Sequence, residues 1–381
     1  MSEFSRRSVL GGVAAGSMLA AAATTEGLAS EQPPSGPTPA LLAGAELPSF
    51  RFALGAVAPK AYEGGWLRAA PVAQFPVSQK LASALMQLAP GGLRELHWHS
   101  NAAEWAYVIK GECRVTTIDP HNRSEVVDFG PGDVWYFPRG YGHSIQGIGR
   151  EDCQFILVFD NGYFSEFGTF SISDWVGHIP PAVLAKALGV PAQRFANFAK
   201  REVYIAKGTV PPPLPPRPAP DASVPTHRFR LLEQKPEEYT GGTNRLVSQR
   251  EFPISATMTG AHMRIKPGGV REPHWHPNAD EWQYYISGRA SMSVFGSHGR
   301  IRTENFGAGD IGYVPQGYGH YIENTGTEDI EAVVVFNNGT YESISLSAWL
   351  AVNPPALLAA NFGVPPDTFA GFPTGARYIV R

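Results

Sequence analysis

The chain has little cysteine, little excess charge and no hydrophobic run long enough for a membrane span. Its 381 residues include two cysteines, Cys113 and Cys153, which either pair after export or pack as small core residues. The net charge is −3 and no basic run occurs, so nucleic acid is not an expected partner. The mildly apolar stretch at residues 9–23 is too short to cross a bilayer. We therefore expect no membrane association of the mature protein.

The N-terminus has the pattern of an export signal. Ser5-Arg6-Arg7-Ser8-Val9-Leu10 resembles a twin-arginine motif, and an Ala- and Gly-rich apolar stretch with small residues follows it. We predict that residues 1–30 are a signal peptide of the twin-arginine type. The mature protein is then expected in the periplasm or outside the cell.

Glycine and proline are abundant, and the sequence contains an internal repeat. The 41 glycines and 34 prolines favour a turn-rich, all-β protein over a helical one. Residues of the first half recur 177 positions later, which indicates two copies of one module. A proline-rich stretch at 211–218 predicts a stiff linker between them. Matching pairs include Tyr62 and Tyr239, Gly111 and Gly288, Pro138 and Pro315, and Phe159 and Phe336.

Short β-branched and aromatic runs predict the strands of each copy, and strands at such spacing form a sandwich or barrel. Each copy ends in a helical stretch interrupted by proline, at 173–188 and 347–362, which suits docking between modules or subunits. We expect the first barrel at 31–207, the linker at 208–226 and the second barrel at 227–381. The predicted strands are 104–109, 113–118, 134–138 and 155–159, repeated at 281–286, 290–295, 311–315 and 332–336.

Four potential metal ligands recur with the same spacing in both copies. Side chains two apart in a strand share a face, so each His-Trp-His directs two imidazoles the same way. Three imidazoles and one carboxylate suit a divalent transition metal with open coordination positions, and suit zinc–thiolate or calcium sites poorly. Six of the eleven histidines fall in these sets, which disfavours ordinary core or surface roles. The predicted ligands are His97, His99, Glu104 and His143, and His274, His276, Glu281 and His320.

An arginine precedes the first histidine of each set by three residues. Arg94 and Arg271 fit a small carboxylate substrate that binds the metal at one end and a guanidinium at the other; a surface salt bridge is the alternative. Strict strand alternation places Arg94 on the opposite face from His97. A bend at Gly91-Gly92 would return it to the same face.

The 177-residue register breaks at one place. Trp175 matches Trp349 at a difference of 174, so the first copy has three extra residues within 163–169. An asymmetric insertion in a repeat protein marks a candidate functional loop, while a neutral change of loop length is the alternative. This loop contains the carboxylate of Glu166, with Gly168 as a possible hinge.

The ligand spacing matches the cupin signature. Gly-x5-His-x-His-x4-Glu-x6-Gly spans 91–111 and 268–288, and Gly-x5-Pro-x-Gly-x2-His spans 132–143 and 309–320. The chain thus resembles the cupins, which implies an all-β bicupin of two tandem jelly-roll β-barrels, each with a short C-terminal helical tail. The phrases Arg94-Glu95-Leu96-His97-Trp98-His99 and Glu104-Trp105-Ala106-Tyr107 make it similar to the bicupin oxalate decarboxylases.

The resemblance implies an Mn-dependent conversion of oxalate to formate and CO2. It implies two Mn²⁺ ions per chain, one per cupin domain, dioxygen as redox co-catalyst, and a homo-oligomer, either a trimer or a hexamer. Glu166 would carry the proton on a lid loop, Arg94 would be catalytic, and Arg94, Arg271 and Tyr341 would bind substrate. The loop departs from the family at Phe167 and Gly168, and the second copy has Val334 where the family has a glutamate, which favours the first site for catalysis.

Four alternatives differ in chemistry. The nearest is a bicupin oxalate oxidase that produces H2O2 and CO2, against which Glu166 argues. Another small-carboxylate metal oxygenase and a quercetinase-like dioxygenase are the next, and an arginine beside the metal favours a small anion over a bulky substrate. A storage or binding protein is the fourth, and the presence of all eight ligands argues against it.

Overall fold

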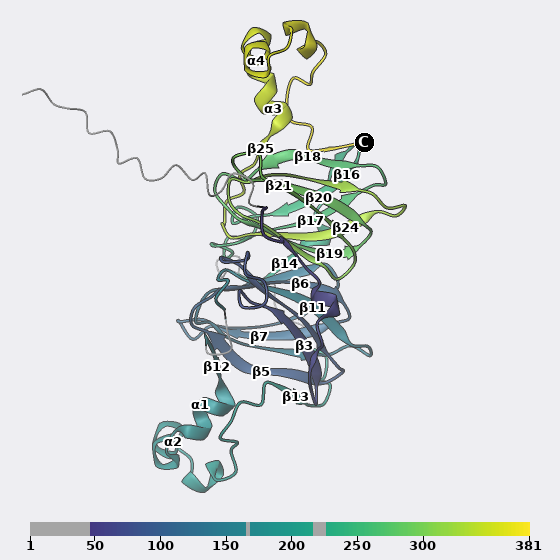
Figure 1. Ribbon diagram of the computed structural model, residues 1–381. Coiled ribbons are helices and arrows are strands. Elements are labelled where there is room, and N and C mark those ends of the chain that lie inside the picture. Colours follow the sequence, from purple (N-terminus) through teal and green to yellow (C-terminus); the bar gives the residue numbers. More distant parts are fainter. Residues whose placement is uncertain (1–45, 165–167, 216–225) are drawn as a thin grey trace, which may run out of the picture. The chain divides into compact units, whose positions relative to one another are not determined.

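The computed structural model describes residues 46–164, 168–215 and 226–381 (Figure 1). The predicted signal peptide, Glu166 and most of the predicted linker lie outside the described residues. Among the described residues, no helix combines the length and apolar character that a bilayer crossing requires.

Each half of the chain folds into two antiparallel sheets packed around a core, which confirms the predicted jelly-roll architecture. The first module has one sheet in the order β14-β9-β6-β11-β4-β3-β2 and another in the order β12-β5-β10-β7-β8, with β13 added to β5. The bounds in the first sheet are β2 (Lys60–Tyr62), β3 (Gly65–Ala70), β4 (Ala82–Leu88), β6 (Glu104–Lys110), β9 (Asp133–Phe137), β11 (Cys153–Phe159) and β14 (Arg228–Arg230), and those in the second are β5 (Gly92–His99), β7 (Cys113–Ile118), β8 (Ser124–Phe129), β10 (Gly142–Gly147), β12 (Thr169–Ser171) and β13 (Ile205–Lys207).

The second module repeats this arrangement. Its sheets have the orders β1-β22-β19-β24-β17-β16-β15 and β21-β20-β23-β18-β25, with β26 added to β18. The bounds in the first sheet are β1 (Arg51–Phe52), β15 (Glu237–Tyr239), β16 (Gly242–Val247), β17 (Thr259–Ile265), β19 (Glu281–Ser287), β22 (Ile311–Val314) and β24 (Ile330–Phe336), and those in the second are β18 (Val270–Trp275), β20 (Ala290–Phe295), β21 (Ile301–Phe306), β23 (Gly319–Asn324), β25 (Ile344–Ser345) and β26 (Ile379–Val380).

The modules exchange their leading strands. β1 precedes the first module in sequence but pairs with β22 of the second, while β14 precedes the second module and pairs with β9 of the first. The backbone N–H of Tyr313 donates to Phe50 O, and that of Tyr136 donates to His227 O, at the same 177-residue offset. The edges of β9 and β22 are thereby covered by the other half of the chain, an arrangement that local sequence patterns did not indicate.

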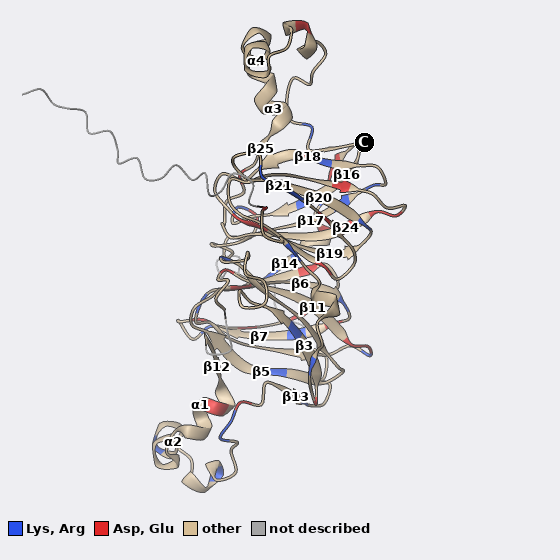
Figure 2. Cartoon of the chain, viewed as in Figure 1, with Lys and Arg blue, Asp and Glu red and all other residues tan. Residues whose placement is uncertain are grey.

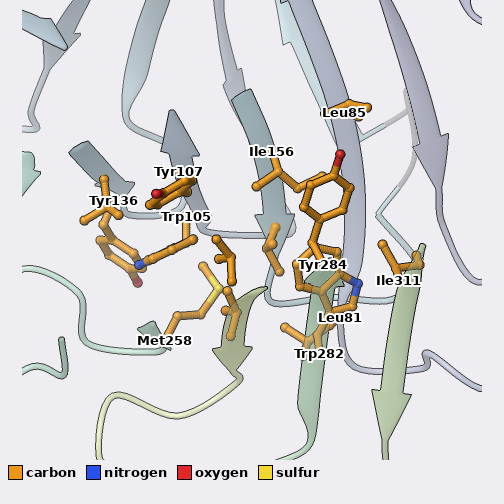
Figure 3. Packing of buried hydrophobic residues seen from close by; sticks show 14 of the residues in the cluster. Leu81, Leu85, Trp105, Tyr107, Tyr136, Ile156, Met258, Trp282, Tyr284 and Ile311 are labelled. Carbon is orange, nitrogen blue, oxygen red and sulfur yellow. The ribbon is translucent and has the colours of Figure 1, made fainter. Parts of the chain in front are cut away.

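A shared core explains why the central strands are apolar on both faces. One hydrophobic cluster combines side chains of both modules, including Trp105 and Ile156 from the first and Trp282 and Tyr284 from the second (Figure 3). Strands such as β4 and β11 face their own barrel core on one side and this cluster on the other. They are therefore nearly continuously buried, whereas less and more exposed residues alternate along β7 and β21.

The helical tails are broken by proline, as predicted. In each tail a proline begins the second helix at its first residue, and a left-handed glycine, Gly189 or Gly363, ends it. The first tail contains α1 (Ile172–His178) and α2 (Pro181–Leu188), and the second contains α3 (Leu346–Ala351) and α4 (Pro355–Phe362).

The two cysteines lie buried and are not disulfide-bonded. Cys113 begins β7 and Cys153 begins β11, and both side chains belong to the core of the first barrel. The hydrogen bond between the two thiols and their burial raise the pKa of Cys113 well above its ordinary value. In this state they are small core residues.

Candidate metal centre

Each barrel brings one of the two predicted ligand sets together. In the first, His97 and His99 lie on one face of β5, Glu104 begins β6, and His143 of β10 stands opposite His97 in the strand register. The potential ligand atoms of each set lie within 4.8 Å of one another, and all of these side chains are buried. The second set has the same arrangement, with His274 of β18 opposite His320 of β23.

Backbone carbonyls orient most of the imidazole rings. His97 Nδ1 lies 2.6 Å from Glu95 O, and His143 Nδ1 lies 2.9 Å from Tyr141 O. A carbonyl oxygen only accepts, so each Nδ1 carries the proton and each Nε2 keeps its lone pair for a metal. The same contact recurs from His274 Nδ1 to Glu272 O at 2.7 Å, from His276 Nδ1 to Glu342 O at 2.7 Å, and from His320 Nδ1 to Tyr318 O at 3.1 Å.

The lone pairs of these imidazoles face a carboxylate. His276 Nε2 lies 2.8 Å and His320 Nε2 lies 3.0 Å from Glu281 Oε2, with both Nδ1 protons already donated elsewhere. In the first set, His143 Nε2 lies 3.4 Å from Glu104 Oε2 and is buried without a hydrogen-bond partner among the described residues. Electron pairs that converge in this way are stabilised by a cation between them. The donor set therefore fits a divalent transition metal.

Burial and neighbouring groups keep the ligands in their metal-binding protonation states. Burial lowers the pKa of His99 to about 4, so this imidazole is neutral near pH 7. Burial alone would raise the pKa of Glu104, but the neighbouring imidazoles of His143 and His99 hold it well below its usual range. Trp135 Nε1 also donates to Glu104 Oε1 at 2.8 Å and orients the carboxylate.

A β-bulge places Arg94 on the same face as the ligands. In the pairing of β5 with β10, His97 stands opposite His143, whereas Arg94 stands opposite Ile145, so three steps on β5 match two on β10. The extra residue resets the strand alternation between Arg94 and His97. The predicted bend at Gly91-Gly92 is thus wrong in its position, because the irregularity lies after Arg94. β18 has the same shift between Arg271 and His274.

Each arginine rests on a tyrosine that sequence reasoning missed. The Arg94 guanidinium carbon lies 3.7 Å from the ring centroid of Tyr204, and Arg271 lies 3.7 Å from that of Tyr378. The signal was present as the Tyr-Ile pairs at 204–205 and 378–379, but these match at the shifted offset of 174 beyond the helical tails.

The two metal centres differ in the space around them. A cavity of about 390 Å³ is lined by Arg94 and by three of the four ligands, His97, His99 and Glu104. Its lining also includes Lys60, Leu67 and Arg68. The cavity at the second centre measures only about 20 Å³. There Tyr341 replaces Phe164 of the first module, and its hydroxyl lies 3.1 Å from that of Tyr378. The first centre has room for a substrate, and the second is nearly filled by its own side chains.

Strand pairing narrows the loop insertion to residues 165–169. Phe164 lines the first cavity where Tyr341 lines the second, at the 177-residue offset. Phe170 and Ser171 pair with Trp98 and His97 as Ile344 and Ser345 pair with Trp275 and His274, at the 174-residue offset. The three extra residues therefore lie within 165–169, a stretch that contains Glu166 and of which residues 165–167 lie outside the described residues.

The buried imidazoles predict an acid-sensitive stability for the metal-free protein. Burial lowers the pKa of His99 to about 4 from 6.5 and that of His97 and His274 well below 6.5. Between pH 6.5 and about 4 the unfolded chain binds protons that the folded chain does not. The free energy of unfolding should then fall by about 1.4 kcal/mol per imidazole for each pH unit of acidification.

Thermal unfolding of chelator-treated protein between pH 7 and pH 5.5 measures this slope, above the range where most carboxylates titrate. His99→Leu removes one buried imidazole and should make the slope shallower. A melting temperature that is independent of pH across this range would contradict the prediction.

Comparison with known proteins places these features in context. A model of the Cupin family matches residues 56–194 and 229–368. Oxalate decarboxylase OxdC of Bacillus subtilis is 44% identical over 308 residues, which cover 80% of each chain. A structure of the Bacillus subtilis oxalate decarboxylase at pH 4.6 superposes with a TM-score of 0.83 and 41% identity over 88% of each chain. Another structure, from work on the Mn(II) centres of that enzyme, has a TM-score of 0.83 and 40% identity over 88% of this chain and 90% of the other.

Proposed function

Because this chain belongs to the cupin family, and within it to the bicupin oxalate decarboxylases, we propose that it is a manganese-dependent oxalate decarboxylase that works at its first metal centre. The observation that carries this proposal is the cavity of about 390 Å³ that is lined by a buried arginine and by His97, His99 and Glu104 of the three-histidine, one-glutamate ligand set. This arrangement matches a small dicarboxylate in size and in charge. The reaction would convert hydrogen oxalate to formate and CO2 and is redox-neutral overall.

The ligands of both centres suit manganese. His97, His99, Glu104 and His143 would hold one ion and His274, His276, Glu281 and His320 the other, and the relative with 40% identity has Mn(II) centres. Bound manganese supplies a redox-active Lewis acid with open coordination positions, and dioxygen would act as redox co-catalyst. Imidazole and carboxylate donors leave such positions open to substrate oxygen.

Arg94 would bind and orient the substrate. Its side chain is 2% exposed, and its Nη1 donates to Tyr204 O at 3.2 Å, which leaves other guanidinium N–H groups for a carboxylate. Phe159 and Phe164 stack at a ring-centroid distance of 3.7 Å and form an apolar wall of the same cavity. In such a dry site the attraction between guanidinium and oxalate is stronger than in water. Arg271 and Tyr341 have the corresponding positions at the second centre.

Glu166 would move the proton. The proposal rests on its place in the first-module loop that has three more residues than its counterpart, and on the family resemblance of the loop 163–169. Its carboxylate would accept the proton of hydrogen oxalate and, after the carbon–carbon bond breaks and CO2 leaves, return it to the remaining carbon atom, giving formate. One group that serves as base and then as acid keeps the proton balance closed within the site.

The first test quantifies formate and hydrogen peroxide together, using purified manganese-loaded protein with oxalate in aerated, mildly acidic buffer. We expect about one formate per oxalate and little peroxide. Peroxide and CO2 without formate would instead identify an oxalate oxidase, which the altered residues Phe167 and Gly168 would explain. Neither product from protein with confirmed metal would contradict both readings.

Export and assembly are two further parts of the proposal. The twin-arginine pattern supports export to the periplasm or beyond. The N-terminal sequence of protein recovered outside the cytoplasm tests this part, and protein that still begins at Met1 would contradict it.

The helical tails support a homotrimer or hexamer, because Trp175 and Trp349 are 56% and 57% exposed and α3 and α4 contain no charged residue (Figure 2). A monomer in sedimentation analysis would contradict such an assembly.

A further inference from the structure

A buried carboxylate lies directly beside Arg94 without facing the cavity. Glu95 is 5% exposed, and its Oε1 accepts hydrogen bonds from the backbone N–H groups of Val203 at 2.8 Å and Tyr204 at 2.5 Å. Its Oε2 accepts from the hydroxyl and the backbone N–H of Ser173. One side chain thus ties β5 to the start of α1 and to the segment that precedes β13.

This carboxylate holds Tyr204 in a conformation that tyrosine rarely adopts. The φ angle of Tyr204 is +67°, in the left-handed region that is sterically disfavoured for a bulky side chain. Such a residue keeps this backbone only where its surroundings impose it. The two N–H groups held by Glu95 Oε1 are those of Tyr204 itself and of the residue before it, so the Glu95 carboxylate stabilises the turn where the disfavoured angle occurs.

The same conformation makes Tyr204 the support of Arg94. The guanidinium carbon of Arg94 lies 3.7 Å from the Tyr204 ring centroid, and Arg94 Nη1 donates to Tyr204 O at 3.2 Å. The backbone N–H of Glu95 donates to the same carbonyl at 3.0 Å. The backbone and the ring of Tyr204 therefore set the position from which the guanidinium reaches the cavity.

The second module contains the same set of contacts, but a different residue precedes its tyrosine. Glu272 Oε1 accepts from the backbone N–H groups of Arg377 and Tyr378, both at 2.6 Å, and its Oε2 accepts from Ser347. Tyr378 has a φ angle of +59° and lies under Arg271. Valine precedes the tyrosine in one module and arginine in the other, so the shared geometry follows from the glutamate and the tyrosine.

We propose that Glu95 is a positioning residue for substrate binding at the first metal centre. Its carboxylate holds Tyr204 in the left-handed conformation, and Tyr204 in turn fixes the Arg94 guanidinium for a substrate carboxylate. Loss of the carboxylate leaves two N–H groups without their acceptor, and the segment relaxes toward negative φ. Arg94 then loses its support and becomes free to adopt other rotamers. This inference rests on the proposed function, because oxalate is the anion that Arg94 would bind.

The test compares Glu95→Ala with Glu272→Ala. Alanine removes both acceptor oxygens, so the two backbone N–H groups lose their carboxylate acceptor. We expect Glu95→Ala to raise KM for oxalate and the calorimetric Kd of oxalate, measured on manganese-loaded protein without dioxygen, about tenfold, and to change kcat less than threefold, because Arg94 binds ground and transition states alike. Both variants should keep two manganese ions per chain. Glu272→Ala should lose similar thermal stability and keep the wild-type KM and Kd.

Several results would overturn the inference. Equal changes of KM in the two variants would mean a general structural effect, and an unchanged Kd in Glu95→Ala would remove the positioning role. If Glu95→Ala does not fold, Tyr204→Leu removes the supporting ring instead and should raise KM similarly; an unchanged KM there would also overturn the inference. Wild-type protein that makes no formate would disprove the proposed function. Active wild-type protein together with an unchanged affinity for oxalate in Glu95→Ala would disprove the inference alone.

Discussion

Replacing Arg94 with alanine is expected to lower kcat/KM for oxalate decarboxylation about 10³-fold, while Arg271→Ala leaves it within about threefold. Both arginines are almost fully buried and both rest on a tyrosine ring at 3.7 Å. Only Arg94 faces a cavity with room for a dicarboxylate, of about 390 Å³ against about 20 Å³. The reason for the asymmetry is therefore access to substrate.

The hydrogen bonds of Arg271 are a second reason to expect little effect of Arg271→Ala. Arg271 Nη2 donates to Ser343 Oγ at 3.2 Å and Arg271 Nη1 donates to Tyr378 O at 3.3 Å, which directs its donors to the protein itself. Initial rates of formate production, with manganese content measured in each variant, check the prediction. Equal losses in the two variants, or a larger loss in Arg271→Ala, would place catalysis at the second centre or at both.

Replacing Glu166 with glutamine is expected to lower the rate of formate production by 10²–10⁴-fold, a typical contribution of a positioned acid–base group. Glutamine keeps the size and the polarity of the side chain but neither accepts nor returns a proton. None of the eight predicted ligands is changed, so manganese content should stay at the wild-type level. Hydrogen peroxide should rise, because an intermediate that is not protonated is open to oxidation.

Ser165→Ala is the matched control for Glu166→Gln, since it alters the neighbouring residue of the same loop without removing the carboxylate. It should retain formate production within a few-fold. Formate production at the wild-type rate in Glu166→Gln would exclude the assigned role and direct attention to another proton carrier at the first cavity. A parallel loss in Ser165→Ala would indicate that the loop conformation, and not the carboxylate, is what matters.

The local parts of the metal centres were accessible to sequence reasoning because they depend on strand geometry. Two histidines separated by one residue share a face in any regular strand, and a glutamate five positions after the second histidine begins the next strand. The 177-residue repeat then showed that the pattern is not accidental. The predicted strand 113–118 and the proline breaks of both tails were also correct, because glycine and proline act on their own backbone positions.

The position of the Arg94 side chain could not be predicted from local strand geometry. Alternation along β5 places it on the wrong face, and the bulge that corrects this exists only in the pairing with β10, about fifty residues later in the chain. Tyr204 is separated from Arg94 by the whole helical tail, and no local pattern brings them together. The exchange of β1 and β14 between modules likewise depends on which edges are open in the folded barrels.

The sequence by itself determined the two-module jelly-roll fold, the two ligand sets and the kind of metal that such donors accept, because these follow from residue type and spacing along single strands. Only the tertiary structure decided which centre has room for a substrate and how its arginine is held. Those properties arise where residues distant in sequence meet: Phe164 against Tyr341 at the cavities, and Glu95 with Tyr204 beneath Arg94. Two ligand sets of identical spacing are therefore found in one open centre and one nearly filled centre.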